Sequence, residues 1–298
     1  MNSSLRYWTW CAGLVFVAVA LGFAVPSFGQ TEPSAVVGAV AVADGAPRIL
    51  APGVMRSVDP ELHEGETVSR HDVVELLAVD PELELAKDVV FRRIIWHLEF
   101  QYKPMRMILV DVPQADGRMK RKLIWYMVYS VSNPGKVMPS VQAADGTYQL
   151  QDSDQPALFI PEFRLASHEF NKVYPDRVIP IAMGPIRMRE DPNREFYNSV
   201  EMVRPIEPGK TVWGVATWED VDRRIDRFSV YVNGLTNAYR WEDTPGAFKP
   251  GDPIGKGRKW VRKTLKLNFW RPGDEYYEHE KEFRVGLPGE VDYEWVYR

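Results

Sequence analysis

Apolar side chains recur at every second position over many short stretches after residue 88, a period typical of β-strands. Two of these stretches, 105–112 and 122–131, are separated by residues 113–117, whose Asp-Gly pair predicts a hairpin turn. Pro and Asn residues divide the rest of the chain into further short runs. These runs predict additional strands over residues 157–165, 178–182, 186–189, 198–203, 211–218, 227–232 and 264–270.

Residues 122–131 are apolar on both sides of the predicted strand. One face carries Trp125, Met127 and Tyr129, and the other carries Tyr126. Both faces of such a strand must be covered, so we expect it at the centre of a packed sheet with Trp125 in the core.

Many short strands, turn residues between them and no long amphipathic helix predict a mainly β protein, an antiparallel β-sandwich over residues 88–298. Three segments carry a resemblance to a known family: LIWYMVYSVSNPG at 123–135, FIPEFRL at 159–165 and VWGVATWEDVD at 212–222. They resemble strands and turns of immunoglobulin-like modules in uncharacterised exported bacterial proteins. The inter-sheet cysteines of classical immunoglobulin domains are absent, so the resemblance implies an immunoglobulin-like architecture and no activity, ligand or partner.

The first 29 residues have the order of a secretory signal peptide. Arg6 precedes an apolar core at residues 14–25, and Ser27 and Gly29 supply the small residues of a cleavage site. The alternative is an uncleaved membrane anchor, because the uncharged run 7–31 exceeds the ~20 residues that span a bilayer. We expect an exported protein, periplasmic or extracellular, that meets a membrane only if the leader is uncleaved.

The only cysteine, Cys11, lies within this leader. Cleavage after Gly29 would leave a chain with no thiol, no disulfide and no cysteine metal ligand. Residues 30–87 are rich in small residues and proline, which predicts a disordered linker. One short helix is expected within it, from Ser69 with an acid at Asp72 to about Ala78.

Composition and charge exclude few function classes. The 298 residues are 45% hydrophobic and 26% charged, which is sufficient for a globular core. The formal net charge of −4 argues against a nucleic-acid partner, which selects basic domains.

No catalytic motif or cofactor site is found in the sequence. Each of the three His-Glu pairs lacks the second histidine of a metalloprotease helix, and no nucleophile elbow occurs. A hydrolase without a recognised motif would need a pocket that holds at least two groups from among His97, His168, His279 and nearby carboxylates. Residues 251–257 lack the spacing of a phosphate loop, so a hairpin or surface loop is expected there.

Two charged features leave alternatives open. Asp220, Asp222 and Asp226 could hold calcium, but interleaved arginines favour an ion-paired turn, so no metal site is expected. The basic clusters 118–122 and 256–259 either keep sheet edges soluble or form a site for acidic glycans.

Three aromatic residues lie on the polar side of their predicted strands: Trp213, Tyr231 and Trp270. Exposed rings in such positions could form a platform for a sugar or a protein partner, unless another segment covers them. The favoured interpretation is an exported, non-enzymatic structural or interaction module. The alternatives are a carbohydrate- or polymer-binding β-sandwich that uses these rings and a hydrolase without a recognised motif.

Cleavage of the leader should give a mature protein that begins at or near Gln30, because Ser27 and Gly29 form the small-residue site. Mass spectrometry of protein from the native host measures this terminus. An intact Met1 or Cys11 would contradict the prediction and favour the anchor.

Overall fold

The computed structural model describes residues 48–49, 55–58, 74–76, 90–92, 94–139, 143–144, 148–253, 255–271, 283–287 and 289–298. The chain divides into two compact units, and all described residues belong to the second, Val37–Arg298. This unit is mainly β, with several antiparallel sheets, as the sequence predicted. Among the described residues no helix is long and apolar enough to cross a membrane. The predicted signal peptide lies outside the described residues.

One sheet is assembled around the long strand β8, and its strands are β2 (Arg56–Val58), β6 (Glu99–Tyr102), β7 (Arg106–Pro113), β8 (Met119–Ser132) and β15 (Thr211–Trp218). β7 and β6 pair successive parts of β8, and β15 pairs its other edge. The turn between β7 and β8 is the predicted hairpin: Gly117 has φ +79°, and the Gln114 amide donates to the Arg118 carbonyl at 2.8 Å.

A second sheet is assembled around another long strand, β18, and contains β1 (Arg48–Ile49), β12 (Glu162–Ser167), β13 (Val173–Pro175), β16 (Arg227–Asn233), β18 (Arg258–Trp270), β19 (Arg284–Val285) and β20 (Tyr293–Tyr297). β16 pairs one edge of β18, and β20 and β19 pair the other. Segments far apart in sequence close both sheets: β1 pairs β19, and Arg56 on β2 forms an ion pair with buried Asp292.

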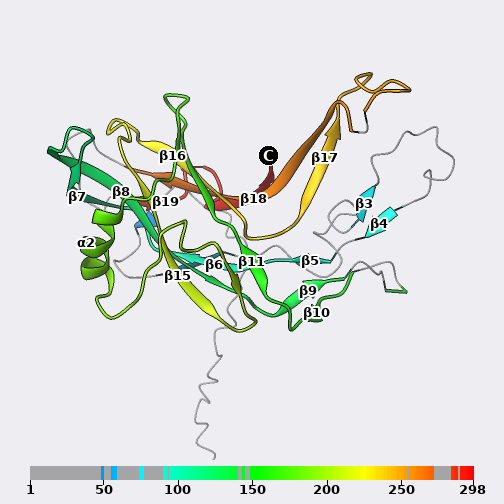
Figure 1. The fold of residues 1–298 in the computed structure, drawn as a ribbon, viewed down its shortest axis with the longest axis horizontal. Coiled ribbons are helices and arrows are strands. Elements are labelled where there is room, and N and C mark those ends of the chain that lie inside the picture. Colours follow the sequence, from blue (N-terminus) through cyan, green and yellow to red (C-terminus); the bar gives the residue numbers. More distant parts are fainter. Residues whose placement is uncertain are drawn as a thin grey trace, which may run out of the picture. The chain divides into compact units, whose positions relative to one another are not determined.

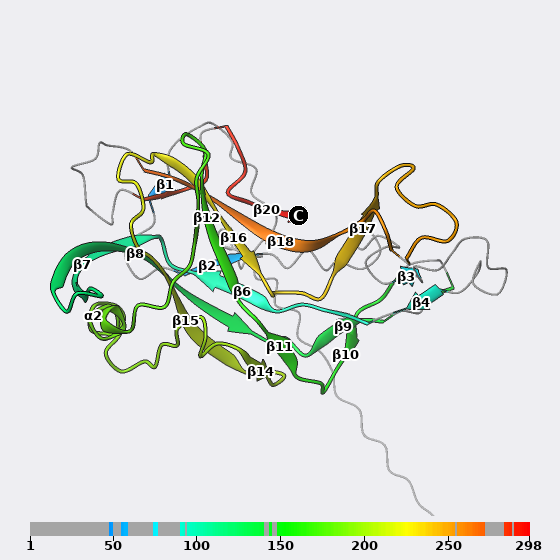
Figure 2. The same cartoon turned by 45° about the horizontal axis from the view of Figure 1, so that its top comes forward.

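Smaller ladders complete the β-structure (Figures 1 and 2). They pair β3 (Val74–Leu76) with β4 (Val90–Arg92), β9 (Lys136–Met138) with β5 (Ile95–Trp96) and β10 (Gln151–Asp152), and β11 (Ala157–Phe159) with β14 (Arg204–Ile206).

The two large sheets share one hydrophobic core, to which β8 contributes Trp125 and β16 contributes Phe228. Trp125 is fully buried, with the rings of Phe228 and Phe283 edge-on at 5.5 and 5.1 Å between centroids. The guanidinium carbon of Arg271, itself buried, lies 5.3 Å from the Trp125 ring, and this group donates to the Arg223 carbonyl. The expected central position of Trp125 is confirmed.

The opposite face of β8 is covered by helix α2 (Pro180–Glu190), where Ala182 and Ile186 pack against Tyr126 and its neighbours. The buried carboxylate of Glu190 ends this helix. It accepts from Lys103 Nζ, Arg106 Nη1 and the Tyr126 hydroxyl, each at 2.9 Å. Burial opposes ionisation of Glu190, but these hydrogen bonds and the two cations outweigh it and lower its pKa.

α2 replaces the strands predicted over residues 178–182 and 186–189, and this prediction is wrong. Buried positions Ile179, Ala182 and Ile186 recur three and four residues apart, the spacing of a helix face. Pro180 at the first turn suits a helix start, while Pro185 inside the helix hid the pattern.

Two further predictions are wrong. Residues 198–203 form a turn, in which the Asn198 side chain accepts from the amides of Val200 and Glu201, so β14 begins only at Arg204. Within the helix expected from Ser69 to Ala78, Val74–Leu76 is strand β3, because pairing with β4 outweighs the local helix-start signal. Strands β1 and β2 lie in the expected linker, of which most residues are outside the described ranges.

The strand predicted over 264–270 continues further than expected. β18 begins at Arg258, and its first residues pair with β17 (Tyr239–Asp243) in a two-stranded ribbon. In both views β17 and this half of β18 run side by side past the end of β16 (Figures 1 and 2). We call β17, residues 258–263 and the connecting loop the arm. Residues 251–253 and 255–257 belong to its loop, in agreement with the hairpin or surface loop expected there.

Replacing Trp125 by Ala should lower the free energy of unfolding by roughly 3–5 kcal/mol, because it empties a fully buried site. Trp270→Ala is the matched control. Trp270 is half-buried outside the core and contacts the Arg284 guanidinium at 4.8 Å, so its loss should cost under ~1 kcal/mol. Denaturant unfolding followed by circular dichroism measures both. Equal losses of unfolding free energy in the two variants would show that burial of the tryptophan does not determine the cost of removing it.

Candidate functional site

The structure does not bring the three predicted ligand-binding aromatics together. Trp213 lies on the α2 side of the β8 sheet, whereas Tyr231 and Trp270 lie on the outer face of the β18 sheet. An arginine covers each half-buried ring, with its guanidinium carbon 4.0, 3.9 and 4.8 Å from the ring centroid in the pairs Arg194–Trp213, Arg298–Tyr231 and Arg284–Trp270. Their role in ligand binding stays a prediction.

The histidines proposed for a hydrolase are also separated. The His168 amide donates to the Arg227 carbonyl at 3.1 Å, at one end of β16, and His97 forms a β-bridge with Thr236 beyond the other end. His168 Nε2 lies 2.7 Å from Ser229 Oγ, a serine–histidine contact of catalytic length. Ser229 is fully buried, however, and its hydroxyl donates to Asn268 Oδ1 at 2.7 Å, so its proton is directed away from the histidine. His279 lies outside the described residues.

The acidic turn after β15 is held by ion pairs. Lys122 Nζ lies 2.9 Å from Asp220 Oδ2 and 3.0 Å from Glu219 Oε2. Asp222 accepts from the Arg224 guanidinium at 2.9 Å, and this hydrogen bond lowers the pKa of Asp222 to about 2. Among the described residues, no group of three or more His, Cys, Asp or Glu is placed to hold a metal ion.

A hollow beside α2 is lined by two carboxylates and two guanidinium groups, from Asp191, Glu195, Arg194 and Arg204. Arg194 Nε lies 3.1 Å from Asp191 Oδ2, and the Tyr197 hydroxyl donates to Glu195 at 2.6 Å. Its carboxylates and cations neutralise each other, so this hollow offers little charge to a ligand.

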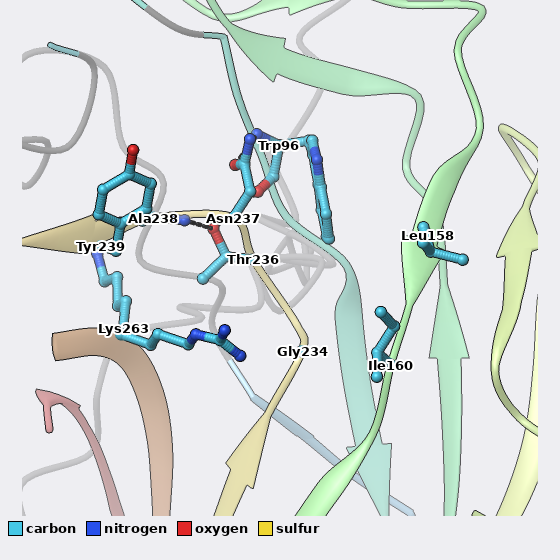
Figure 3. A pocket seen from close by; sticks show the side chains of 10 residues that line it. Trp96, Leu158, Ile160, Gly234, Thr236, Asn237, Ala238, Tyr239 and Lys263 are labelled. Atoms are coloured by element: carbon cyan, nitrogen blue, oxygen red, sulfur yellow. Dashed lines mark hydrogen bonds between the residues drawn. The ribbon is translucent and has the colours of Figure 1, made fainter. Parts of the chain in front are cut away.

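A pocket of about 200 Å³ at the base of the arm is different in composition (Figure 3). Its walls come from three regions: Trp96 on β5, Leu158 and Ile160 around β11, and Arg262 and Lys263 on β18. The remaining lining residues are Gly234, Thr236, Asn237 and Ala238, from the segment that joins β16 to β17, and Tyr239 at the start of β17.

The segment between β16 and β17 is fixed by its contacts with β5. The Thr236 hydroxyl donates to the Trp96 carbonyl at 2.7 Å, and the Trp96 amide donates to Asn237 Oδ1 at 2.9 Å. Gly234 has φ +95°, and a Cβ there would lie 2.2 Å from the Ile160 carbonyl oxygen. Only glycine allows this approach of two backbone segments, so the pocket floor depends on Gly234.

The pocket joins an apolar wall to a cationic one. Leu158 and Ile160 line the pocket and are 50% and 54% exposed, and in Figure 3 the Trp96 ring lies between them and Thr236. Arg262 and Lys263 supply two positive charges, and no Asp or Glu is among the described residues that line the pocket. The arrangement can therefore bind an anion that also has an apolar surface.

Sequence reasoning missed Trp96, Tyr239 and Arg262. Residues 256–259 were recognised as a basic cluster, but the strand that contains them was not. Alternation at Arg258, Trp260 and Arg262 was the available signal, since every second residue of a strand shares a face.

The melting temperature should be unchanged by EDTA, because lysine and arginine already neutralise the carboxylates of the acidic turn. Thermal unfolding with and without chelator measures this. A fall of more than about 5 °C would exceed the effect of ~1 kcal/mol in a chain of this size. That result would restore calcium at Asp220, Asp222 and Asp226.

Comparison of the chain with protein-family models, with curated proteins and with solved structures finds no match. The chemistry of the pocket at the base of the arm is therefore inferred from its lining residues alone. These residues give an apolar and aromatic wall, two cations and a glycine-dependent floor.

Proposed function

We propose that the chain is an exported, non-enzymatic binding module that binds an acidic saccharide in the pocket at the base of the arm. The observation that carries this proposal is the composition of the pocket: an indole and two aliphatic side chains face two cations, and no carboxylate lines the wall among the described residues.

An acidic sugar matches both walls. The C–H face of a sugar ring is apolar and suits contact with Trp96, Leu158 and Ile160. The sugar carboxylate suits Arg262, whose planar guanidinium binds carboxylates through two parallel hydrogen bonds. Lys263, whose side chain is buried on the other face of the strand with Nζ 5.9 Å from the Trp295 ring, adds a second positive charge to the lining.

A binding role agrees better with these contacts than hydrolysis does. The serine of the Ser229–His168 contact is fully buried and lies outside the pocket, and His97 and His168 are at opposite ends of β16. A hydrolase would need acid and base groups that converge on a ligand.

The proposal includes an immunoglobulin-like β-sandwich as the scaffold. Two antiparallel sheets that share one core support it, as does stabilisation by aromatic packing in a chain whose only cysteine lies in the leader. Export rests on the leader sequence alone.

Arg262→Ala should weaken binding of an acidic tetrasaccharide at least about tenfold, because it removes the group that pairs with the carboxylate. Lys259→Ala is the matched control, since it removes one charge from the same strand at a residue that does not line the pocket, and it should change the dissociation constant less than about twofold. Isothermal titration calorimetry with tetrasaccharides of pectate, alginate and hyaluronate measures these affinities, and their methyl esters test the need for charge.

The proposal fails if none of the three tetrasaccharides binds, or if the methyl ester binds as tightly as the acid. Equal losses in the Arg262 and Lys259 variants would also contradict it, because they would indicate non-specific attraction to a basic arm.

A further inference from the structure

We infer that the saccharide is a polymer, and that its chain continues from the pocket along one face of the arm, over Tyr239 and Trp260. This inference rests on the proposed function and adds a second subsite to it.

The pocket and the arm face are continuous. Tyr239 and Arg262 line the pocket and are also cross-strand partners at the root of the arm. Arg258, Trp260 and Arg262 alternate on β18, so they lie on the same face as Tyr239. A ligand that leaves the pocket at Arg262 therefore meets Trp260 next, about 7 Å further along the strand.

Trp260 is placed as a stacking surface. It is 46% exposed, although it is one of the largest apolar side chains in the protein. The Tyr239 ring meets it edge-on at 5.1 Å and 70°, and the Arg258 guanidinium carbon lies 5.8 Å from its centroid, so both neighbours restrict the indole. Asp243 pairs with Arg258 through two hydrogen bonds of 2.7 and 2.8 Å, and this pair fixes the ribbon next to Trp260.

The charge of the arm selects an anionic occupant. Residues 239–263 contain seven basic and three acidic side chains, a net charge of +4 in a chain whose net charge is −4. Asp243 and Asp252 are already paired, with Arg258 and Lys256. Repeated negative charge, as in a polyuronate, is complementary to this surface.

Side-chain pairs within the arm stiffen it. A two-stranded ribbon is only marginally stable by itself, and the pairs Arg258–Asp243 and Tyr239–Trp260 connect its two strands, while the Trp260 side chain stays 46% exposed. Such preorganisation lowers the entropy lost when a flexible polymer binds.

The test compares a tetrasaccharide with a decasaccharide of the same polyuronate, measured by calorimetry on the full-length protein. The decasaccharide should bind at least about tenfold more tightly, since it reaches the second subsite. Trp260→Ala should remove this gain and leave the tetrasaccharide affinity unchanged. Trp260→Phe, which keeps a ring, should retain most of the gain, and an unchanged melting temperature shows that both variants are folded.

Arg262→Ala separates the two proposals. If the tetrasaccharide binds through Arg262 but the decasaccharide binds no more tightly, the polymer inference is overturned and the proposed function stands. If the tetrasaccharide does not bind at all while the decasaccharide binds through Trp260, the pocket proposal fails and the arm surface stands. Single-stranded DNA of equal charge that binds as tightly as the decasaccharide would overturn the assignment to a saccharide.

Discussion

The packing of both faces of β8 is the constraint on which the rest of the described structure depends. On one face Trp125 fills the core shared by the two large sheets and lies under the buried guanidinium of Arg271. On the other, Tyr126 and its neighbours require the cover of α2, which Glu190 attaches to Lys103 and Arg106. A buried ion cluster of this kind contributes more to the placement of α2 than to net stability, because desolvation offsets much of its attraction.

The arm follows from unequal strand lengths. β18 is longer than the strands that pair with it in its sheet, so its first residues extend beyond the core. There they pair with β17. The polypeptide between β16 and β17 then crosses the sheet end next to β5, and this crossing creates the pocket. Position and chemistry of the candidate site thus have one origin, the continuation of β18 past its sheet.

Alternation of apolar residues was sufficient to predict the β7–β8 hairpin, β15, β16 and the burial of Trp125, because each depends on a local period. α2 was missed because Pro185 interrupts a short helical pattern, and β3 because pairing with a distant strand decided its conformation. The pocket could not be predicted from the sequence for a different reason. Trp96 and Arg262 are more than 160 residues apart, and only the register of several sheets brings them together.

The pairing of chain ends has a consequence for the timing of folding. Arg56 and Asp292 are 236 residues apart, and β1 joins its sheet only through β19. Closure of so long a loop carries a large entropic cost, and it requires that residues 284–292 have already been synthesised. In a growing chain, β1 therefore stays without its partner strand, and Arg56 without Asp292, until the C-terminal residues have left the ribosome. The last strands to be synthesised thus complete the part of the structure that contains one of the first.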